Sequence, residues 1–162
     1  MRNNLPVGVK LRSFSVNLPW GIGGVNMEVT DTEARTAWQL YVEFATRISA
    51  QPLAAGDGSV REALDSLYTL FASTRDVLRD AGPDVARGAQ AVGPLAIRAL
   101  NEGLRPFLVA WHTELTAAAR EGGDGELGAE RRAAFDRQLA QLQGELAQYV
   151  SALAEMAGVR DA

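Results

Sequence analysis

Three side chains able to bind an anion recur at intervals of seven residues: Arg98, Arg105 and His112. Seven residues are close to two turns of an α-helix, so a regular helix would place all three on one face. Two guanidinium groups can hold a carboxylate or a phosphate through paired hydrogen bonds, and the imidazole supplies a titratable donor. Glu102 lies between the arginines, and Pro106 frees the Glu102 carbonyl. Two interpretations stay open: a surface for a partner or ligand, and the solvated face of an amphipathic helix.

Residue types exclude most catalytic and metal-binding sites. The chain of 162 residues has no cysteine and one histidine. It therefore lacks thiolate nucleophiles, zinc fingers, iron–sulfur clusters and every motif that needs two histidines. No nucleophile or second base accompanies His112, and nothing resembles the carboxylate pair of a glycosidase. We expect no catalytic residue, no metal and no cofactor.

The glycine-rich segment Gly21-Ile22-Gly23-Gly24 has the composition of a phosphate-binding loop but the wrong context. Such a loop needs glycines between a strand and a helix, followed by lysine and a hydroxyl residue. Here Val25 and Asn26 follow, and they begin a run of alternating apolar residues. The segment is typical of a hairpin turn.

The balance of charge argues against a broad nucleic-acid interface. There are 16 Lys+Arg and 20 Asp+Glu residues, a formal net charge of −4, whereas sequence-independent binding depends on many cations at the phosphates. We therefore expect no general nucleic-acid binding. Residues 1–20 contain no apolar stretch of signal-peptide length, and no uncharged run approaches the length of a membrane span. These features predict a cytoplasmic protein without membrane association.

Alternating apolar residues predict a β-hairpin over residues 7–29. One run extends from Val7 to Leu18 and changes phase around Arg12, as at a bulge; the second extends from Val25 to Val29. A short segment rich in Pro and Gly joins the runs. It contains Trp20, which we expect to be an exposed aromatic residue suited to an interface.

Four amphipathic helices are predicted after the hairpin, near residues 31–50, 59–81, 94–120 and 129–157. The first two begin at capping boxes, in which Ser or Thr is followed three residues later by Glu. Their apolar rows, and that of the third helix, include Trp38, Tyr68 and Ile97.

Two prolines lie in the third predicted helix. Pro94 suits its first position, and Pro106 in its interior predicts a kink near Glu102–Arg105. The residues before Pro94 are rich in Ala and Gly and predict no more than a short helical turn.

The last helix has the most regular pattern. Its large apolar residues are spaced 4, 3, 4, 3, 4 and 3 residues apart: Phe135, Leu139, Leu142, Leu146, Tyr149, Leu153 and Met156. A repeat near 3.5 residues is typical of bundle packing at a shallow angle. The predicted fold is mainly α: one domain over 1–162, with a four-helix bundle-like body (31–157) preceded by the N-terminal β-hairpin.

The order of segments resembles an uncharacterised, largely actinobacterial family of helical proteins. The resemblance is carried by Leu18-Pro19-Trp20-Gly21, Ala37-Trp38-Gln39-Leu40-Tyr41, Leu64-Asp65-Ser66-Leu67-Tyr68 and Leu104-Arg105-Pro106-Phe107-Leu108 with Trp111-His112. Thr113 departs from the proline expected after the Trp-His pair. The resemblance implies this order of elements and a loose association with bacterial conflict or defence loci; it implies no catalytic residue or ligand.

Two functions follow from these observations. The first is a non-enzymatic protein-interaction module, an adaptor or regulatory subunit, that uses Arg98, Glu102, Arg105, His112 and Trp20. Its partner is another protein or a second copy of the chain. The second is a sensor for a small anionic ligand or nucleotide, held by Arg98, Arg105 and His112.

Overall fold

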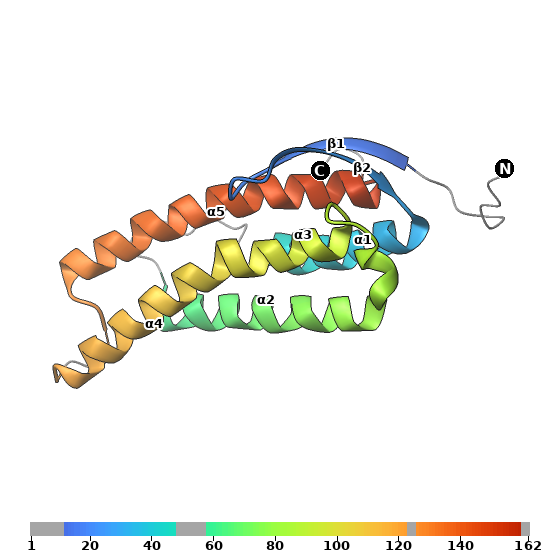
Figure 1. The fold of residues 1–162 in the computed structure, drawn as a ribbon. Coiled ribbons are helices and arrows are strands. Elements are labelled where there is room, and N and C mark those ends of the chain that lie inside the picture. The colour runs from blue at the N-terminus through green and yellow to red at the C-terminus, as the bar shows by residue number, and fades with distance from the viewer. Residues whose placement is uncertain (1–11, 48–57, 123–125, 160–162) are drawn as a thin grey trace, which may run out of the picture.

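The computed structural model describes residues 12–47, 58–122 and 126–159. It begins with an antiparallel hairpin of β1 (Arg12–Leu18) and β2 (Gly23–Val29), in which Arg12 pairs with Val29 and Leu18 with Gly23. One face of the hairpin is buried at Val16, Leu18, Val25, Met27 and Val29. Figure 1 shows the hairpin lying along the last helix, so the predicted β-hairpin is confirmed over these residues. The bulge predicted around Arg12 and Ser13 is not present in the described pairing, in which Arg12 pairs with Val29 and Ser13 with Glu28 in an uninterrupted register; the run before Arg12 lies outside the described residues.

Helix α1 (Asp31–Ala45) follows β2 directly. Thr30 and Glu33 form the predicted capping box, in which each side chain accepts a hydrogen bond from the other's backbone N–H. The helix ends at Ala45, before the predicted residue 50; the Thr46 hydroxyl and N–H both donate to the Val42 carbonyl at this end. The turn-rich break predicted after the helix lies largely outside the described residues.

Helix α2 (Val60–Ala81) has nearly the predicted bounds, with Ser59 as N-cap and Gly82 at its end. Of the predicted capping box only one hydrogen bond forms, in which the Glu62 N–H donates to the Ser59 hydroxyl at 3.5 Å. Gly82 has a φ of 73°, a left-handed value that glycine adopts without the steric cost of a Cβ. A single 3₁₀ turn, η1 (Pro83–Ala86), follows and is the short turn that the sequence predicts before the third helix.

The third predicted helix is one continuous helical run in three parts: α3 (Val92–Arg98), the π-helical turn η2 (Ala99–Leu104) and α4 (Arg105–Arg120). It begins two residues before Pro94. The early start has a tertiary cause, because the buried Glu33 carboxylate accepts a hydrogen bond from the Val92 N–H at 3.4 Å. Pro94 is therefore the third helical residue and not the first.

The disruption predicted near Glu102–Arg105 takes the form of the π turn. The Arg105 N–H donates to Leu100, five residues back. Pro106 has no N–H, and its ring would clash with the Glu102 carbonyl in a regular α-helix. A wider turn before Pro106 relieves this clash and keeps the helix continuous.

Helix α5 (Ala129–Ala157) has the predicted bounds and ends at Gly158, which has a φ of 75°. All seven residues of its predicted apolar row are buried. Figure 1 shows α5 between the hairpin and the other helices, consistent with its contacts to β1, α1, η2 and α4. The fold is thus mainly α with an N-terminal β-hairpin, as predicted.

Three aromatic or aliphatic residues of the predicted apolar rows are exposed instead. Trp38 is 49% exposed, Tyr68 42% and Ile97 49%. In α1 the buried stripe is Glu33, Thr36, Ala37, Leu40 and Phe44. Trp38 lies outside it and stacks on the neighbouring Tyr41 with ring centroids 5.7 Å apart. The buried stripes of α1, α2 and α3 are therefore narrower than the predicted apolar rows.

Candidate functional site: the surface between α2 and α4

The predicted row of Arg98, Arg105 and His112 does not form one face. A π turn holds about one residue more than an α turn, and one residue rotates a helix by about 100°. Because η2 lies between Arg98 and Arg105, this extra residue turns Arg105 and His112 away from Arg98. The seven-residue spacing is preserved between Arg105 and His112, which lie together on α4.

Arg98 is engaged with Glu102. Its Nε donates to Glu102 Oε1 at 2.9 Å, and a second guanidinium nitrogen donates to Oε2 at 3.1 Å. This paired hydrogen bond raises the pKa of Arg98 and lowers the pKa of Glu102. The Arg98 guanidinium, for which the sequence predicts an anionic ligand, thus binds the Glu102 carboxylate of the same chain.

Arg105 and His112 both meet aromatic residues of α2. The Arg105 guanidinium carbon lies 5.3 Å from the centre of the Phe71 ring, a cation–π contact. The His112 ring meets Tyr68 edge to face, with centroids 6.4 Å apart and planes at 90°. Both arginine and histidine are exposed. Arg105 therefore packs its guanidinium on an aromatic ring at the edge of the bundle.

These contacts define a surface made by two helices. Tyr68 and Phe71 come from α2, whereas Arg105, Val109 and His112 come from α4 at steps of four and three residues. Val109 is 61% exposed and Tyr68 is 42% exposed. We call Tyr68, Phe71, Arg105, Val109 and His112 the α2–α4 surface. It combines exposed apolar area with Arg and Tyr, two residue types that often dominate the energetics of interfaces.

Trp20 is not the exposed interface residue that the sequence predicts. It has a φ of 60°, Gly21 has a φ of 72°, and the Ile22 N–H donates to the Pro19 carbonyl. Consecutive positive φ values are those of a type I′ turn, which matches the twist of the two strands. The turn directs the indole onto the helices, where Nε1 donates to Glu145 Oε2 at 3.0 Å.

Gly103 provides the space for the Trp20 ring. A Cβ at Gly103 would lie 2.7 Å from two carbon atoms of the indole, closer than side chains tolerate. The indole also meets the Tyr149 ring of α5 edge to face, with ring centroids 5.8 Å apart. Trp20 thus fixes the hairpin tip against η2 and α5, which is a structural role.

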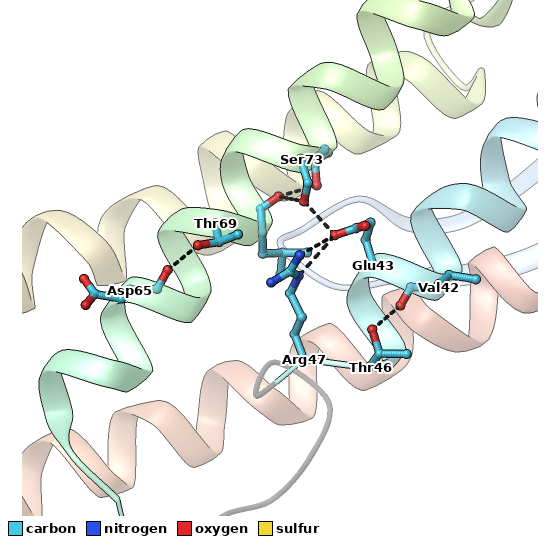
Figure 2. A network of polar contacts seen from close by, with 9 residues as sticks. Val42, Glu43, Thr46, Arg47, Asp65, Thr69 and Ser73 are labelled. Carbon is cyan, nitrogen blue, oxygen red and sulfur yellow. Dashed lines mark hydrogen bonds and ion pairs between the residues drawn. The ribbon is translucent and has the colours of Figure 1, made fainter.

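A polar network joins α1 to α2 (Figure 2). Glu43 accepts hydrogen bonds from Arg47 at 2.8 Å and from the Ser73 hydroxyl at 2.7 Å. The hydrogen bond from Ser73, followed by that from Arg47, lowers the pKa of Glu43. The network therefore links α1 to α2 through the Glu43 carboxylate. The sequence carries the Glu43–Arg47 spacing of four residues, but no local signal for Ser73.

Tyr149 has a buried hydroxyl group with no hydrogen-bond partner among the described residues. Burial raises the pKa of Tyr149 above its ordinary value of 10.0. Above about pH 10 the unfolded chain loses this proton while the folded chain keeps it, so the free energy of unfolding falls as pH rises. We expect urea unfolding between about pH 8 and pH 11 to show this decline, and Tyr149→Phe to reduce it. An unchanged pH dependence in Tyr149→Phe would contradict the assignment.

A surface cavity of about 620 Å³ lies elsewhere, between β2 and the segment that precedes α3. Its lining includes Asn26, Glu28, Asp84 and Arg87, and Arg87 is already paired with Asp84. None of the predicted site residues lines this cavity. In the part of the chain that the structure describes, no three His, Asp or Glu side chains gather as a metal ion would require. Among the helices of the described residues, none combines the length with the apolar composition that a membrane span requires.

No protein-family model, curated protein sequence or solved structure shows significant similarity to this chain. The resemblance to an actinobacterial helical family therefore stays a prediction.

Proposed function

We propose that this chain is a non-enzymatic protein-interaction module that binds its partner through the α2–α4 surface. The observation that carries the proposal is the exposure of Tyr68 and Val109 beside Arg105 and His112. Two helices contribute the surface, so its shape depends on the bundle and is already formed before binding. A preformed surface reduces the entropy cost of association.

The geometry gives less support to a sensor of small anions. Such a site needs convergent donors in a concave pocket. Arg98 donates to Glu102, and η2 rotates Arg98 away from Arg105. Arg105 and His112 lie on an exposed edge and not in the cavity beside β2.

Arg105→Ala tests the proposal because it removes the guanidinium while leaving the buried core untouched. We expect the free energy of unfolding to change by less than about 1 kcal/mol, since an exposed cation–π contact contributes little. Partner binding should weaken at least tenfold, or about 1.4 kcal/mol, because a truncated hot-spot arginine costs this much or more. Arg105→Lys keeps the charge but loses the planar group, and we expect an intermediate loss.

The measurement is capture of proteins from an extract of the source organism, followed by titration of the purified partner. Arg137→Ala is the matched control, because Arg137 is exposed on α5 and outside the α2–α4 surface. Equal binding by the parent and by Arg105→Ala would show that this surface is only a solvated edge. Failure of the parent to capture any protein would contradict the interaction-module function itself.

A further inference from the structure

The α2–α4 surface has a charge that differs from that of the whole chain. The protein has a formal net charge of −4. Phe71 and Tyr68 of α2 meet Arg105 and His112 of α4, and Arg75 lies one turn beyond Phe71. The acidic residue of α2 nearest to Tyr68 in sequence is the exposed Asp65, one turn earlier. The α2–α4 surface together with Arg75 contains two arginines and no Asp or Glu, so it is locally positive.

The arginines of this edge are available to a partner. Within residues 12–47, 58–122 and 126–159, neither Arg75 nor Arg105 forms an ion pair. The acidic residues closest to them in sequence are already matched: Asp76 pairs with Arg79 at 2.6 Å, and Glu102 pairs with Arg98 at 2.9 Å. Among the described residues, no carboxylate therefore pairs with either of these two arginines.

The two helices run in opposite directions along the edge. Tyr68 meets His112, and Phe71 meets Arg105, so residue numbers rise on α2 as they fall on α4. Figure 1 shows α2 and α4 side by side over this region. Such a pair presents a linear track with apolar side chains, Tyr68 and Val109, set among cations. A helix with one apolar face fits a track of this kind.

From this charge and shape we infer that the α2–α4 surface binds an acidic, amphipathic helical segment of a partner protein. The inference rests on the proposed interaction function and adds the chemistry of the partner. Apolar residues of the segment would cover Tyr68 and Val109, and its carboxylates would meet Arg75 and Arg105. Arginine pairs well with carboxylates because its planar donors match their two oxygens.

A single-stranded nucleic acid fits this surface less well. Such ligands stack their bases on open aromatic faces and need a cationic path for the backbone. Here the Phe71 face is covered by the Arg105 guanidinium, and the His112 ring meets Tyr68. The exposed Val109 offers apolar area but no stacking. Apolar contact flanked by cations favours a protein segment.

The test uses the full chain and a synthetic helical peptide of about 20 residues, with leucine on one face and glutamate on both flanks. Two further peptides replace every glutamate by lysine or every leucine by serine. We expect the glutamate–leucine peptide to bind at least tenfold more tightly than either of these in fluorescence anisotropy. Its binding should weaken as salt rises, because exposed charges are screened.

Charge reversal assigns the binding to this surface. The double variant Arg75→Glu with Arg105→Glu should lose at least tenfold of its affinity for the glutamate–leucine peptide and gain affinity for the lysine peptide. Arg137→Glu is the matched control on α5 and should leave the preference unchanged. Melting curves must show that each variant folds; if the double variant unfolds, Arg105→Gln alone should still lower affinity for the glutamate–leucine peptide.

Several results would overturn the inference. One is absence of binding to the glutamate–leucine peptide; another is equal binding of the glutamate and lysine peptides. Tighter binding of a single-stranded oligonucleotide that displaces the peptide would make nucleic acid the ligand. A dimer in light scattering that the double variant abolishes would make a second copy the occupant. If charge reversal leaves the affinity for the captured partner unchanged, the proposed interaction function is retained, but the inference of an acidic helical segment is wrong.

Discussion

Leu142→Ala is expected to lower the free energy of unfolding by about 2–5 kcal/mol, the usual cost of truncating a large buried side chain. Leu142 is 4% exposed and lies in the middle of the apolar row of α5, between Leu139 and Leu146. Truncation removes apolar contacts and leaves a cavity that the surrounding helices fill only in part. Urea unfolding measured by circular dichroism gives the loss directly. A loss below about 1 kcal/mol would contradict the central place of this row in the core.

Gly144→Ala is the matched control on the same helix. Gly144 is exposed, and a Cβ built there meets nothing within 4 Å. Alanine favours helix more than glycine does, so this change should be neutral or stabilising by up to about 1 kcal/mol. The two variants lie two residues apart, and their opposite effects separate core packing from helix propensity.

Glu33→Ala should have the second large effect, a loss of about 2–4 kcal/mol. The Glu33 carboxylate is 5% exposed and accepts hydrogen bonds from two backbone N–H groups, one at Thr30 and one at Val92. Removing it breaks the capping box of α1 and leaves the buried N–H at the start of α3 without a partner. Thermal and urea unfolding measure the total.

Glu33→Gln separates the two contributions of this residue. Glutamine keeps the length of the side chain and one acceptor oxygen, so it can satisfy one of the two N–H groups. We expect a loss smaller than that of Glu33→Ala. Equal stability of Glu33→Ala and the parent would show that water replaces the carboxylate at both helix ends.

The parts of the fold that the sequence predicts best depend on short-range periodicity. The α5 row has seven members at regular spacing, and each member is buried. The capping box at Thr30 needs only residues three apart and is present as predicted. Such signals are local, so neighbours in the sequence are enough to interpret them.

Features that depend on contacts between distant residues cannot be predicted from the local sequence. Glu33 and Val92 are 59 residues apart, and nothing near either residue indicates their hydrogen bond. The apolar rows of α1 and α2 predict that each helix has a buried face, but not how wide that face is. Trp38 and Tyr68 belong to the predicted rows and are nevertheless exposed. Tryptophan is a residue type common at interfaces, yet the turn directs the Trp20 ring onto the helices, where Gly103 leaves space for it.

The candidate site is predicted in part. Arg105 and His112 share a surface as expected. Their aromatic partners Phe71 and Tyr68 come from α2; the periodicity predicts this helix but not which of its residues face α4. Pro106 signals an irregular helix, but hydropathy does not distinguish a kink from a π turn. That distinction decides whether Arg98 joins Arg105, and η2 separates them.

The π turn also has an evolutionary meaning. Relative to a regular helix, η2 is equivalent to the insertion of one residue between α3 and α4. In a homologous chain with a regular helix here, one residue would be missing from the alignment, and α4 would be rotated by about 100° relative to α3. Homologues that keep the α2–α4 surface must therefore keep the length of Ala99–Leu104 as well as the identity of Arg105. Lineages that diverge by a single deletion in this segment would lose the surface without any substitution in it.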